Sequence, residues 1–256
     1  MQVNFFESGA EDAPDLNLHM CFCGNPGTGK TEVAHILSRI LYEAGVLPEA
    51  KLTETDSQGL ISKYVGDTAS KTLAKINDSM GGVLFIDEAY SLTKSGEGDA
   101  AGYGDEAVAV LLKQMEDKRG QFCVIFAGYK AEMSEFTRTN PGLASRIQFT
   151  LDFPDYSREE LSEIALKFLN KKKYEIEDNA LELLLDITEY YRERPNFANA
   201  RTVRSILEQV IMNQNLRTDE ENSNDTMLIL SDVQDYIDDE NIDLNNKSSK
   251  THKIGF

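Results

Sequence analysis

The chain has 256 residues, 41% of them apolar, and its 44 acidic and 26 basic residues give a formal net charge of −18. This length fits one large domain, alone or with a smaller one, and the apolar share is enough for a packed core. No stretch approaches the ~20 apolar residues of a membrane span, and residues 1–15 lack the regions of a signal peptide, so composition excludes an integral membrane protein. A chain this acidic repels nucleic acid unless its basic residues gather on one face, which argues against a nucleic-acid partner.

The cysteines Cys21, Cys23 and Cys123 all lie in apolar runs. Three cysteines cannot form a disulfide framework, and three scattered histidines do not complete a zinc-binding pattern with them. We therefore expect small buried side chains in a reduced, cytoplasmic protein.

Short apolar runs alternate with helical patterns from residue 18 to residue 153. In chain order they predict a strand over 18–23, a helix from Lys30 that stops at Gly45, a strand over 52–55, a helix with Ala69, Leu73, Ile76 and Met80 on one face, and a strand over 83–86. After a Gly-rich loop over 95–104 come a helix marked by Val108, Leu111, Leu112 and Met115, a strand over 122–127 and a strand over 147–153. This alternation predicts an α/β fold, a parallel sheet with helices on both faces joined by right-handed crossovers.

The pattern changes at Pro154, where the strands give way to helices. Ser157 and Glu160 form a capping box that starts a helix over 157–169, and further helices carry Leu181, Leu184 and Leu185 and, from near Asn199, Val203, Ile206, Leu207, Val210 and Ile211. A polar loop over 218–226 leads to a short strand and helix over 227–237. We therefore divide the chain into an α/β core, 1–154, a small helical lid domain, 155–240, and a tail, 241–256, whose Asn, Ser and Lys content predicts disorder.

A glycine-rich segment joins the first strand to the first helix and matches the P-loop pattern of Gly, four residues, Gly, Lys and Ser or Thr. It consists of Gly24, Asn25, Pro26, Gly27, Thr28, Gly29, Lys30 and Thr31. Glycines let the backbone N–H groups approach a phosphate, Lys30 can reach the β- and γ-phosphates, and the Thr31 hydroxyl can hold Mg²⁺. The pattern predicts an ATP site; the alternative is a turn that binds nothing.

Two acidic residues, Asp87 and Glu88, end the apolar strand over 83–86. Asp87 can hold Mg²⁺ through water, while Glu88 can point elsewhere and activate the attacking water, since successive strand residues face opposite ways. A glutamate here favours a hydrolase over a nucleotide kinase or a GTPase; the alternative is a pair of exposed loop acids. The strand over 122–127 is expected to lie between the two strands that carry these motifs.

Four segments in order, GNPGTGKT, GGVLFIDEAYSL, FAGYK and NPGLASRI, resemble the AAA+ ATPases and most closely their CbxX/CfqX branch. The resemblance runs from about Leu18 to Ile237. It implies Mg²⁺-dependent ATP hydrolysis in a ring of identical subunits, a hexamer, coupled to remodelling a protein partner.

The resemblance also implies roles for single residues. Arg146 matches the arginine finger, which reaches the γ-phosphate bound by the neighbouring subunit; the alternative is an arginine in a surface salt bridge. Arg201 matches the sensor 2 arginine at the start of a lid helix, and Arg204, one turn later, is the competing assignment. Tyr129 falls on the sensor 1 position, where many AAA+ proteins have Asn or Thr, and its phenol can still hydrogen-bond a phosphate or water.

Tyr64, in the segment SKYVGDT, matches the central pore loop, where an aromatic side chain grips a threaded peptide. The alternative is an ordinary half-buried tyrosine. Only about 17 residues precede the first predicted strand, fewer than the helical N-terminal segment of AAA+ modules. We therefore expect a shortened N-terminal segment or a fragment of a longer chain.

Two rival functions stay open beside the ring ATPase. One is a nucleotide-dependent scaffold with little turnover, which the short N-terminal segment favours. The other is a DNA-associated ATPase such as a clamp loader, against which the net charge of −18 and Tyr64 both argue.

Overall fold

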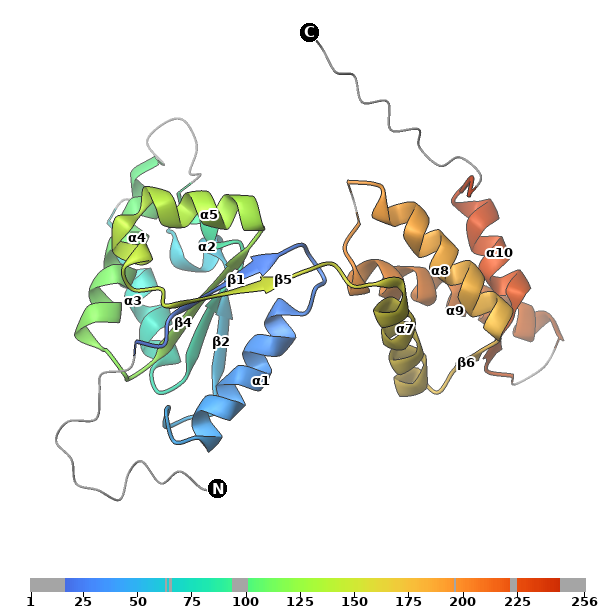
Figure 1. The fold of residues 1–256 in the computed structure, drawn as a ribbon, viewed down its shortest axis with the longest axis horizontal. Helices are drawn as coiled ribbons and strands as arrows, with labels where there is room; N and C mark the ends of the chain where they lie inside the picture. Colours follow the sequence, from blue (N-terminus) through green and yellow to red (C-terminus); the bar gives the residue numbers. More distant parts are fainter. Residues whose placement is uncertain are drawn as a thin grey trace, which may run out of the picture. The chain divides into compact units, whose positions relative to one another are not determined.

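The computed structural model of the protein describes residues 17–62, 64, 66–93, 101–195, 197–221 and 225–244. It divides into two compact units (Figure 1). The first consists of residues 1–25 and 29–154, and the second of residues 26–28 and 155–256. In the described ranges, no helix combines the length and the apolar character that a membrane crossing requires.

A five-stranded parallel sheet forms the centre of the first unit. Its strands are β1 (Met20–Gly24), β2 (Leu52–Thr55), β3 (Val83–Ile86), β4 (Cys123–Gly128) and β5 (Phe149–Phe153), in the order β2-β3-β4-β1-β5. The predicted parallel α/β sheet is confirmed. So is the place of β4 between β1 and β3, the strands that carry the two motifs.

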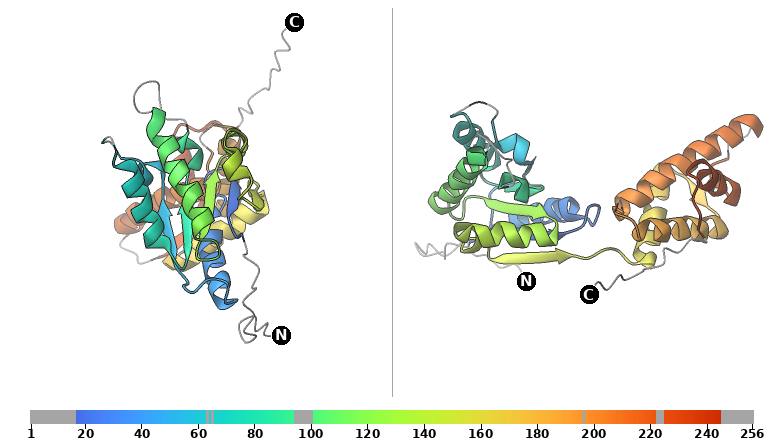
Figure 2. Two further views of the ribbon diagram at one scale, coloured as in Figure 1. Left: turned by 90° about the vertical axis from the view of Figure 1, so that its left-hand side faces the viewer. Right: turned by 90° about the horizontal axis from the view of Figure 1, so that it is seen from above.

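Helices flank this sheet (Figures 1 and 2). They are α1 (Lys30–Glu43), α2 (Ser57–Leu60), α3 (Thr68–Ser79), the 3₁₀ helix η1 (Ala89–Leu92), α4 (Ala101–Asp117), α5 (Lys130–Thr139) and α6 (Pro141–Ala144). Alternate strand residues serve opposite cores: Phe85 packs in the cluster that includes α1, and Leu84 in the cluster that includes α4. All three cysteines are buried and free, as the sequence predicts.

Two expectations for the first unit need correction. The predicted apolar face of α3 is right for Ile76, which is buried, and for Met80, which packs against the core, but it is wrong for Leu73, which is exposed. Thr68 and Thr72 are fully buried in its place. The hydroxyl of Thr72 donates to the Leu60 carbonyl at 3.1 Å, which lets a polar side chain occupy the core. The predicted loop over 95–104 is helical from residue 101, and residues 94–100 lie outside the described residues. The helices α2, α5 and α6 and the 3₁₀ helix η1 were not predicted.

The second unit is helical, as expected. It contains α7 (Arg158–Lys172), α8 (Asp178–Arg192), α9 (Ala200–Glu221) and α10 (Leu230–Asp239), with a short parallel pair formed by β6 (Glu175–Ile176) and β7 (Met227–Leu228). The capping box is confirmed: the Glu160 N–H donates to Ser157 Oγ at 3.2 Å, and the Ser157 N–H to Glu160 Oε2 at 2.8 Å.

The end of the chain departs from the sequence expectations in two places. The predicted loop over 218–226 is wrong at its start, because α9 continues to Glu221; residues 222–224 lie outside the described residues. Ile242 is buried in the core of the second unit, so the first residues of the expected tail pack against its helices. Residues 245–256 of that tail lie outside the described ranges.

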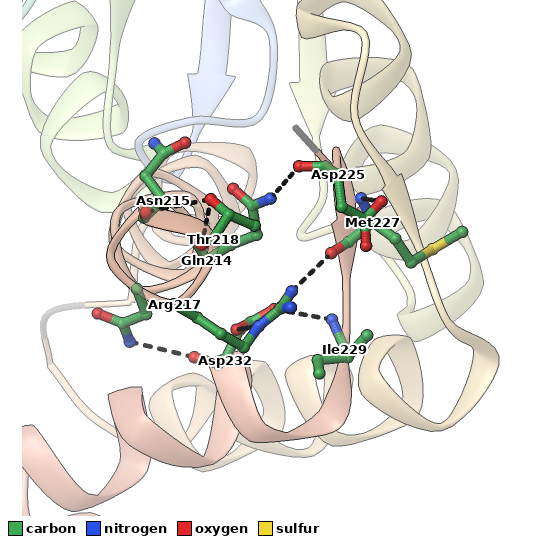
Figure 3. A network of polar contacts seen from close by, with 9 residues as sticks. Gln214, Asn215, Arg217, Thr218, Asp225, Met227, Ile229 and Asp232 are labelled. Carbon is green, nitrogen blue, oxygen red and sulfur yellow. Dashed lines mark hydrogen bonds and ion pairs between the residues drawn. The ribbon is translucent and has the colours of Figure 1, made fainter. Parts of the chain in front are cut away.

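A buried ion pair ties three elements of the second unit together (Figure 3). Arg217 on α9 donates from Nε to Asp232 Oδ1 at 2.8 Å and from Nη2 to Asp232 Oδ2 at 3.2 Å. The same guanidinium donates to the Met227 carbonyl on β7, and Asp232 Oδ2 also accepts the N–H of Ile229 at 2.9 Å. Asp232 is fully buried, and its two carboxylate oxygens therefore have three donors in place of water.

Candidate active site

The glycine-rich loop between β1 and α1 has the backbone geometry that phosphate binding requires. Gly27 and Gly29 adopt the left-handed conformation, with φ of 72° and 88°, which glycine reaches without the steric cost of a Cβ. Gly24 lies so close to β5 that a Cβ there would come within 2.3 Å of the Phe153 carbonyl oxygen. Gly29 leads directly into α1, and no side chain of the described residues caps this helix, so its first N–H groups face outward with partial positive charge.

Lys30 lies over this loop. Its Nζ donates to the carbonyl oxygens of Gly24 at 2.9 Å and of Asn25 at 2.8 Å. The ammonium group is thereby held against the loop, where it would meet the negative charge of a phosphate. Thr31 follows as the second residue of α1 and is half-buried, while Thr28 is buried and Pro26 half-buried.

Asp87 and Glu88 form the turn after β3, and both are exposed. The Asp87 N–H donates to the Thr55 carbonyl at 2.8 Å, which extends the pairing of β2 and β3 by one residue. Glu88 then adopts a left-handed conformation, with φ 47° and ψ 42°, which costs an L-residue about 1–2 kcal/mol. The N–H of Glu88 donates to Asp87 Oδ1 at 3.0 Å, and its carbonyl accepts the N–H of Ser91 at 2.8 Å. Backbone strain that is held in place in this way gathers at functional sites.

Tyr129 follows β4 and begins α5 as its N-cap, and its side chain is half-buried. The ring of Tyr129 lies 6.0 Å from the ring of Tyr90, measured between centroids. Burial, and next the charge of Glu88, raise the pKa of Tyr90 to about 12, so its phenol is neutral at physiological pH. Sequence reasoning missed Tyr90 as a neighbour of the site, although it stands two residues after Glu88.

The strand register brings these motifs to one edge of the sheet. Ile86 pairs with Phe126, and Phe126 pairs with Cys21, so Asp87 and Glu88 continue at the level where β1 enters the glycine-rich loop. Ligands of parallel α/β sheets bind at this carboxyl edge. The sheet therefore aligns the three predicted motifs, although each follows a different strand.

The donors available at this edge fit magnesium held together with a nucleotide. No cluster of three or more His, Cys, Asp or Glu suited to a metal ion occurs among the described residues. The hydroxyl of Thr31 and the carboxylate of Asp87 are oxygen donors, which Mg²⁺ prefers. Magnesium usually takes one or two protein ligands and completes its shell with water and substrate phosphates, so this small donor set is sufficient.

Arg146 follows α6 and is 24% exposed. Its Nη2 lies 3.0 Å from Glu116 Oε2, and its Nη1 donates to the Gly142 carbonyl at 3.1 Å. The salt bridge that was the alternative for this residue is therefore present within the chain.

Tyr64 is 74% exposed, and its N–H donates to Ser62 Oγ at 3.1 Å. The half-buried tyrosine that composition offered as the alternative is therefore wrong. Gly66, two residues later, has φ 85°, and a Cβ added there would meet nothing within 4 Å. Lys63 and Val65, which complete the expected pore-loop motif, lie outside the described residues.

The two arginines that compete as sensor 2 lie in the first turns of α9, and both are exposed. The guanidinium carbon of Arg204 lies 5.7 Å from the ring centre of Phe168 on α7, so Arg204 is engaged within the second unit. Arg201 stands one turn earlier, two residues after the buried Asn199, whose left-handed φ of 49° ends the preceding loop.

Comparison with protein families assigns both parts of the chain. Residues 20–155 match the ATPase family associated with various cellular activities (AAA), and residues 157–243 match the AAA lid domain. The first match ends and the second begins close to Pro154, where the sequence pattern changes.

Among individual proteins, the chain is 43% identical over 203 residues to stage V sporulation protein K of Bacillus subtilis, covering 78% of this chain and 62% of that protein. It is also 43% identical over 198 residues to the chloroplastic ribulose bisphosphate carboxylase/oxygenase activase of Cyanidioschyzon merolae, covering 77% and 67%. The chain thus spans less than two thirds of the length of the sporulation protein. A solved structure of the Thermotoga maritima RuvB Holliday junction branch migration motor has the same fold, with a TM-score of 0.62 at 21% identity, covering 88% of this chain and 63% of that one.

Proposed function

Because the chain belongs to the AAA family of ATPases, we propose that it binds ATP with Mg²⁺ at the carboxyl edge of its sheet and hydrolyses it to ADP and phosphate. The observation that carries this proposal is Lys30, which lies over the glycine-rich loop at the same sheet edge as Asp87 and Glu88. A binding module needs the lysine and the loop, whereas hydrolysis also needs the acids.

The residues of the loop divide the work of binding. Backbone N–H groups from Gly27 to Thr31, at the start of α1, cradle the phosphates, and Lys30 neutralises their charge. To do so, Lys30 exchanges its two carbonyl contacts for phosphate oxygens. Thr31 and Asp87 would hold Mg²⁺, which neutralises charge on the β- and γ-phosphate oxygens. Tyr129 and Arg201 are proposed to contact the nucleotide as sensors.

Glu88 is proposed as the general base. Glu88 follows Asp87 with a left-handed backbone, and in this proposal one carboxylate holds the metal while the other accepts a proton from the attacking water. Arg146 is proposed to act on the nucleotide of a neighbouring copy, where its charge stabilises the departing phosphoryl group. Hydrolysis then depends on assembly of identical subunits, proposed as a hexameric ring.

A protein is the proposed substrate of this ring. One relative is named as the activase of another enzyme, which is a protein partner. Tyr64 is 74% exposed, and Gly66, two residues later, has open space around it, which suits a side chain that contacts a peptide. The fold shared with a DNA motor concerns architecture alone, and the net charge of −18 disfavours DNA.

Two substitutions test the proposal. Lys30→Ala removes the ammonium that neutralises phosphate charge and should abolish binding of a fluorescent ATP analogue. Glu88→Gln should keep binding and lose turnover, because an amide cannot accept the proton of water. Lys113→Ala and Glu43→Gln, at exposed positions on α4 and α1, are the matched controls and should behave as the wild type.

The outcomes separate the ATPase from the nucleotide-dependent scaffold. Wild-type affinity in Lys30→Ala would refute the nucleotide site. Nucleotide binding by the wild type with no turnover at any protein concentration would refute hydrolysis and leave the nucleotide-dependent scaffold.

A further inference from the structure

Arg146 is one of two arginines that share a single carboxylate. Glu116, near the end of α4, lies with Oε1 2.7 Å from Arg119 Nη2 and with Oε2 3.0 Å from Arg146 Nη2. The Gly142 carbonyl accepts a further hydrogen bond from Arg146 Nη1. Two contacts from different elements, α4 and α6, therefore fix the orientation of one guanidinium group.

This arrangement differs from two helical arginine–glutamate pairs on the surface of the same unit. The pair of Arg39 with Glu43 is 3.9 Å long and that of Arg138 with Glu135 is 3.7 Å long, and all four side chains are more than 60% exposed. Arg146 is 24% exposed, and its Nε is buried without a hydrogen-bond partner among the described residues. An unpartnered buried donor costs stability, so folding alone gives no reason for this placement.

The charges of the cluster leave Arg146 suited to an anion. Two arginines and one glutamate sum to a charge of +1, because Arg119 offsets the carboxylate that holds Arg146. A guanidinium group has five N–H donors, and the two contacts use one from each terminal nitrogen. The remaining terminal N–H groups can still form the paired contacts that arginine makes with phosphate.

We propose that Glu116, itself held by Arg119, is a positioning residue that orients Arg146 toward the phosphate bound by a neighbouring copy. This rests on the proposed function, in which Arg146 acts in trans. A free arginine side chain populates many rotamers, and fixing it before the reaction removes an entropic cost from the transition state. Glu116 touches neither nucleotide nor water in this scheme and acts only through Arg146.

The first test is a comparison of steady-state rates. Glu116→Ala should lower kcat by about 10–100-fold, the usual effect of misplacing a catalytic group, with ATP affinity unchanged. Glu116→Gln keeps an oxygen that accepts from Arg146 and should lose less. Glu135→Ala removes the carboxylate of another helical i,i+3 pair and should leave kcat unchanged. Wild-type kcat in Glu116→Ala would overturn the proposal, and a raised kcat would instead make Glu116 a latch that restrains Arg146.

The second test is to mix variants and measure the recovery of turnover, which we would not expect if Glu116 only stabilised its own subunit. Glu116→Ala subunits keep Glu88, and Glu88→Gln subunits keep a well-oriented Arg146, so oligomers shown to be mixed should recover turnover. Glu116→Ala mixed with Arg146→Ala should recover none, because both lack a working finger. Recovery in this second mixture, or none in the first, would overturn the positioning role.

A parallel mixture of Arg146→Ala with Glu88→Gln distinguishes the trans role of Arg146 from the positioning role of Glu116. Recovery there supports a finger in trans whatever Glu116 does. Failure there, in mixed oligomers, would refute the proposed trans role itself, and the positioning role with it.

Discussion

Two arginine–carboxylate pairs, one in each unit, differ in how fully their polar atoms are satisfied. Arg217 and Asp232 form a two-point contact in the second unit, and the fully buried carboxylate also accepts a backbone N–H (Figure 3). Arg146 and Glu116 meet through one nitrogen, and Arg146 Nε stays without a partner among the described residues. The N–H groups of Arg217 thus serve to stabilise the second unit, whereas Arg146 has N–H groups that form no contact needed for folding.

The comparison gives a rule for this chain. When all polar atoms of a buried ion pair have partners in their own unit, a substitution in the pair strongly lowers the free energy of unfolding, because it leaves the other member charged and without water. An incomplete pair at a half-exposed position loses little when it is cut, since water can take over its contacts. Substitutions in the Arg217–Asp232 pair should therefore lower stability more than substitutions in the Arg146–Glu116 pair. For ATPase activity we expect the opposite order.

The largest loss of stability is expected for Asp232→Ala. It strands the Arg217 guanidinium and removes the acceptor for the Ile229 N–H, and breaking such buried pairs costs about 3–5 kcal/mol. Asp235→Ala, an exposed position on the same helix, is the control and should change the free energy of unfolding by less than about 0.5 kcal/mol. Urea denaturation of both variants measures the difference, and equal losses would contradict a structural role for the Arg217–Asp232 pair.

A pH-dependent loss of stability is expected from His19, which lies in the same unit as Arg146. Burial, with smaller contributions from the charges of Arg146 and Arg119, lowers the pKa of His19 from 6.5 to about 4, although a hydrogen bond to the Met115 backbone opposes this. The Val124 N–H donates to His19 Nδ1 at 3.0 Å, a contact that only the unprotonated nitrogen can accept. Between pH 6.5 and 4 the unfolded chain binds a proton that the folded chain does not, so stability falls as the pH falls.

The size of this stability change follows from the lowering of the His19 pKa. A depression of this size corresponds to about 3 kcal/mol, present above pH 6.5 and lost as the pH falls to about 4. His19→Asn keeps an acceptor near Nδ1 and removes the titration, so the stability difference between wild type and variant should change with pH over this window. His35→Asn, at an exposed histidine on α1, is the control. A difference that stays constant from pH 7 to pH 4 would show that His19 titrates normally in the folded chain.

The sheet and the phosphate loop were predictable because each is encoded in contiguous residues. The runs around Phe22, Phe85 and Phe126 are apolar enough to identify buried strands, and the P-loop has its own pattern. By contrast, α5 has only two fully buried side chains, Met133 and Phe136, on a polar helix, which is too little periodicity to detect.

Features that depend on contacts between distant residues were not predictable. Glu116 and Arg146 are 30 positions apart, and nothing in either neighbourhood selects the other. The face of α3 was misassigned because Thr72 is buried through a hydrogen bond to Leu60, a possibility that hydrophobic patterning ignores. The conformation of Glu88 is likewise a property of the folded turn, since the residue type itself disfavours a positive φ.

The smallest effect on stability is expected for Tyr64→Ala. The side chain is 74% exposed, and the hydrogen bond of its backbone N–H to Ser62 does not depend on the ring. Exposed substitutions change the free energy of unfolding by less than about 0.5 kcal/mol, whereas truncation of a packed aromatic costs about 3–5 kcal/mol. Melting curves should therefore match those of the wild type, and basal ATPase activity should persist because no phosphate contact is lost.

The same variant tests the pore role at no cost to the fold. If Tyr64 grips a protein substrate, Tyr64→Ala should lose ATPase stimulation by that protein, whereas Tyr64→Phe, which keeps the ring, should retain most of it. Tyr42→Ala is the matched control, because Tyr42 on α1 is an exposed tyrosine, at 49%, that belongs neither to the P-loop nor to the segment around Tyr64. Equal stimulation of Tyr64→Ala and wild type would refute the pore role. Tyr64 would then resemble the Arg146–Glu116 pair in one respect, since neither is needed for the fold, but its role would lie outside substrate contact.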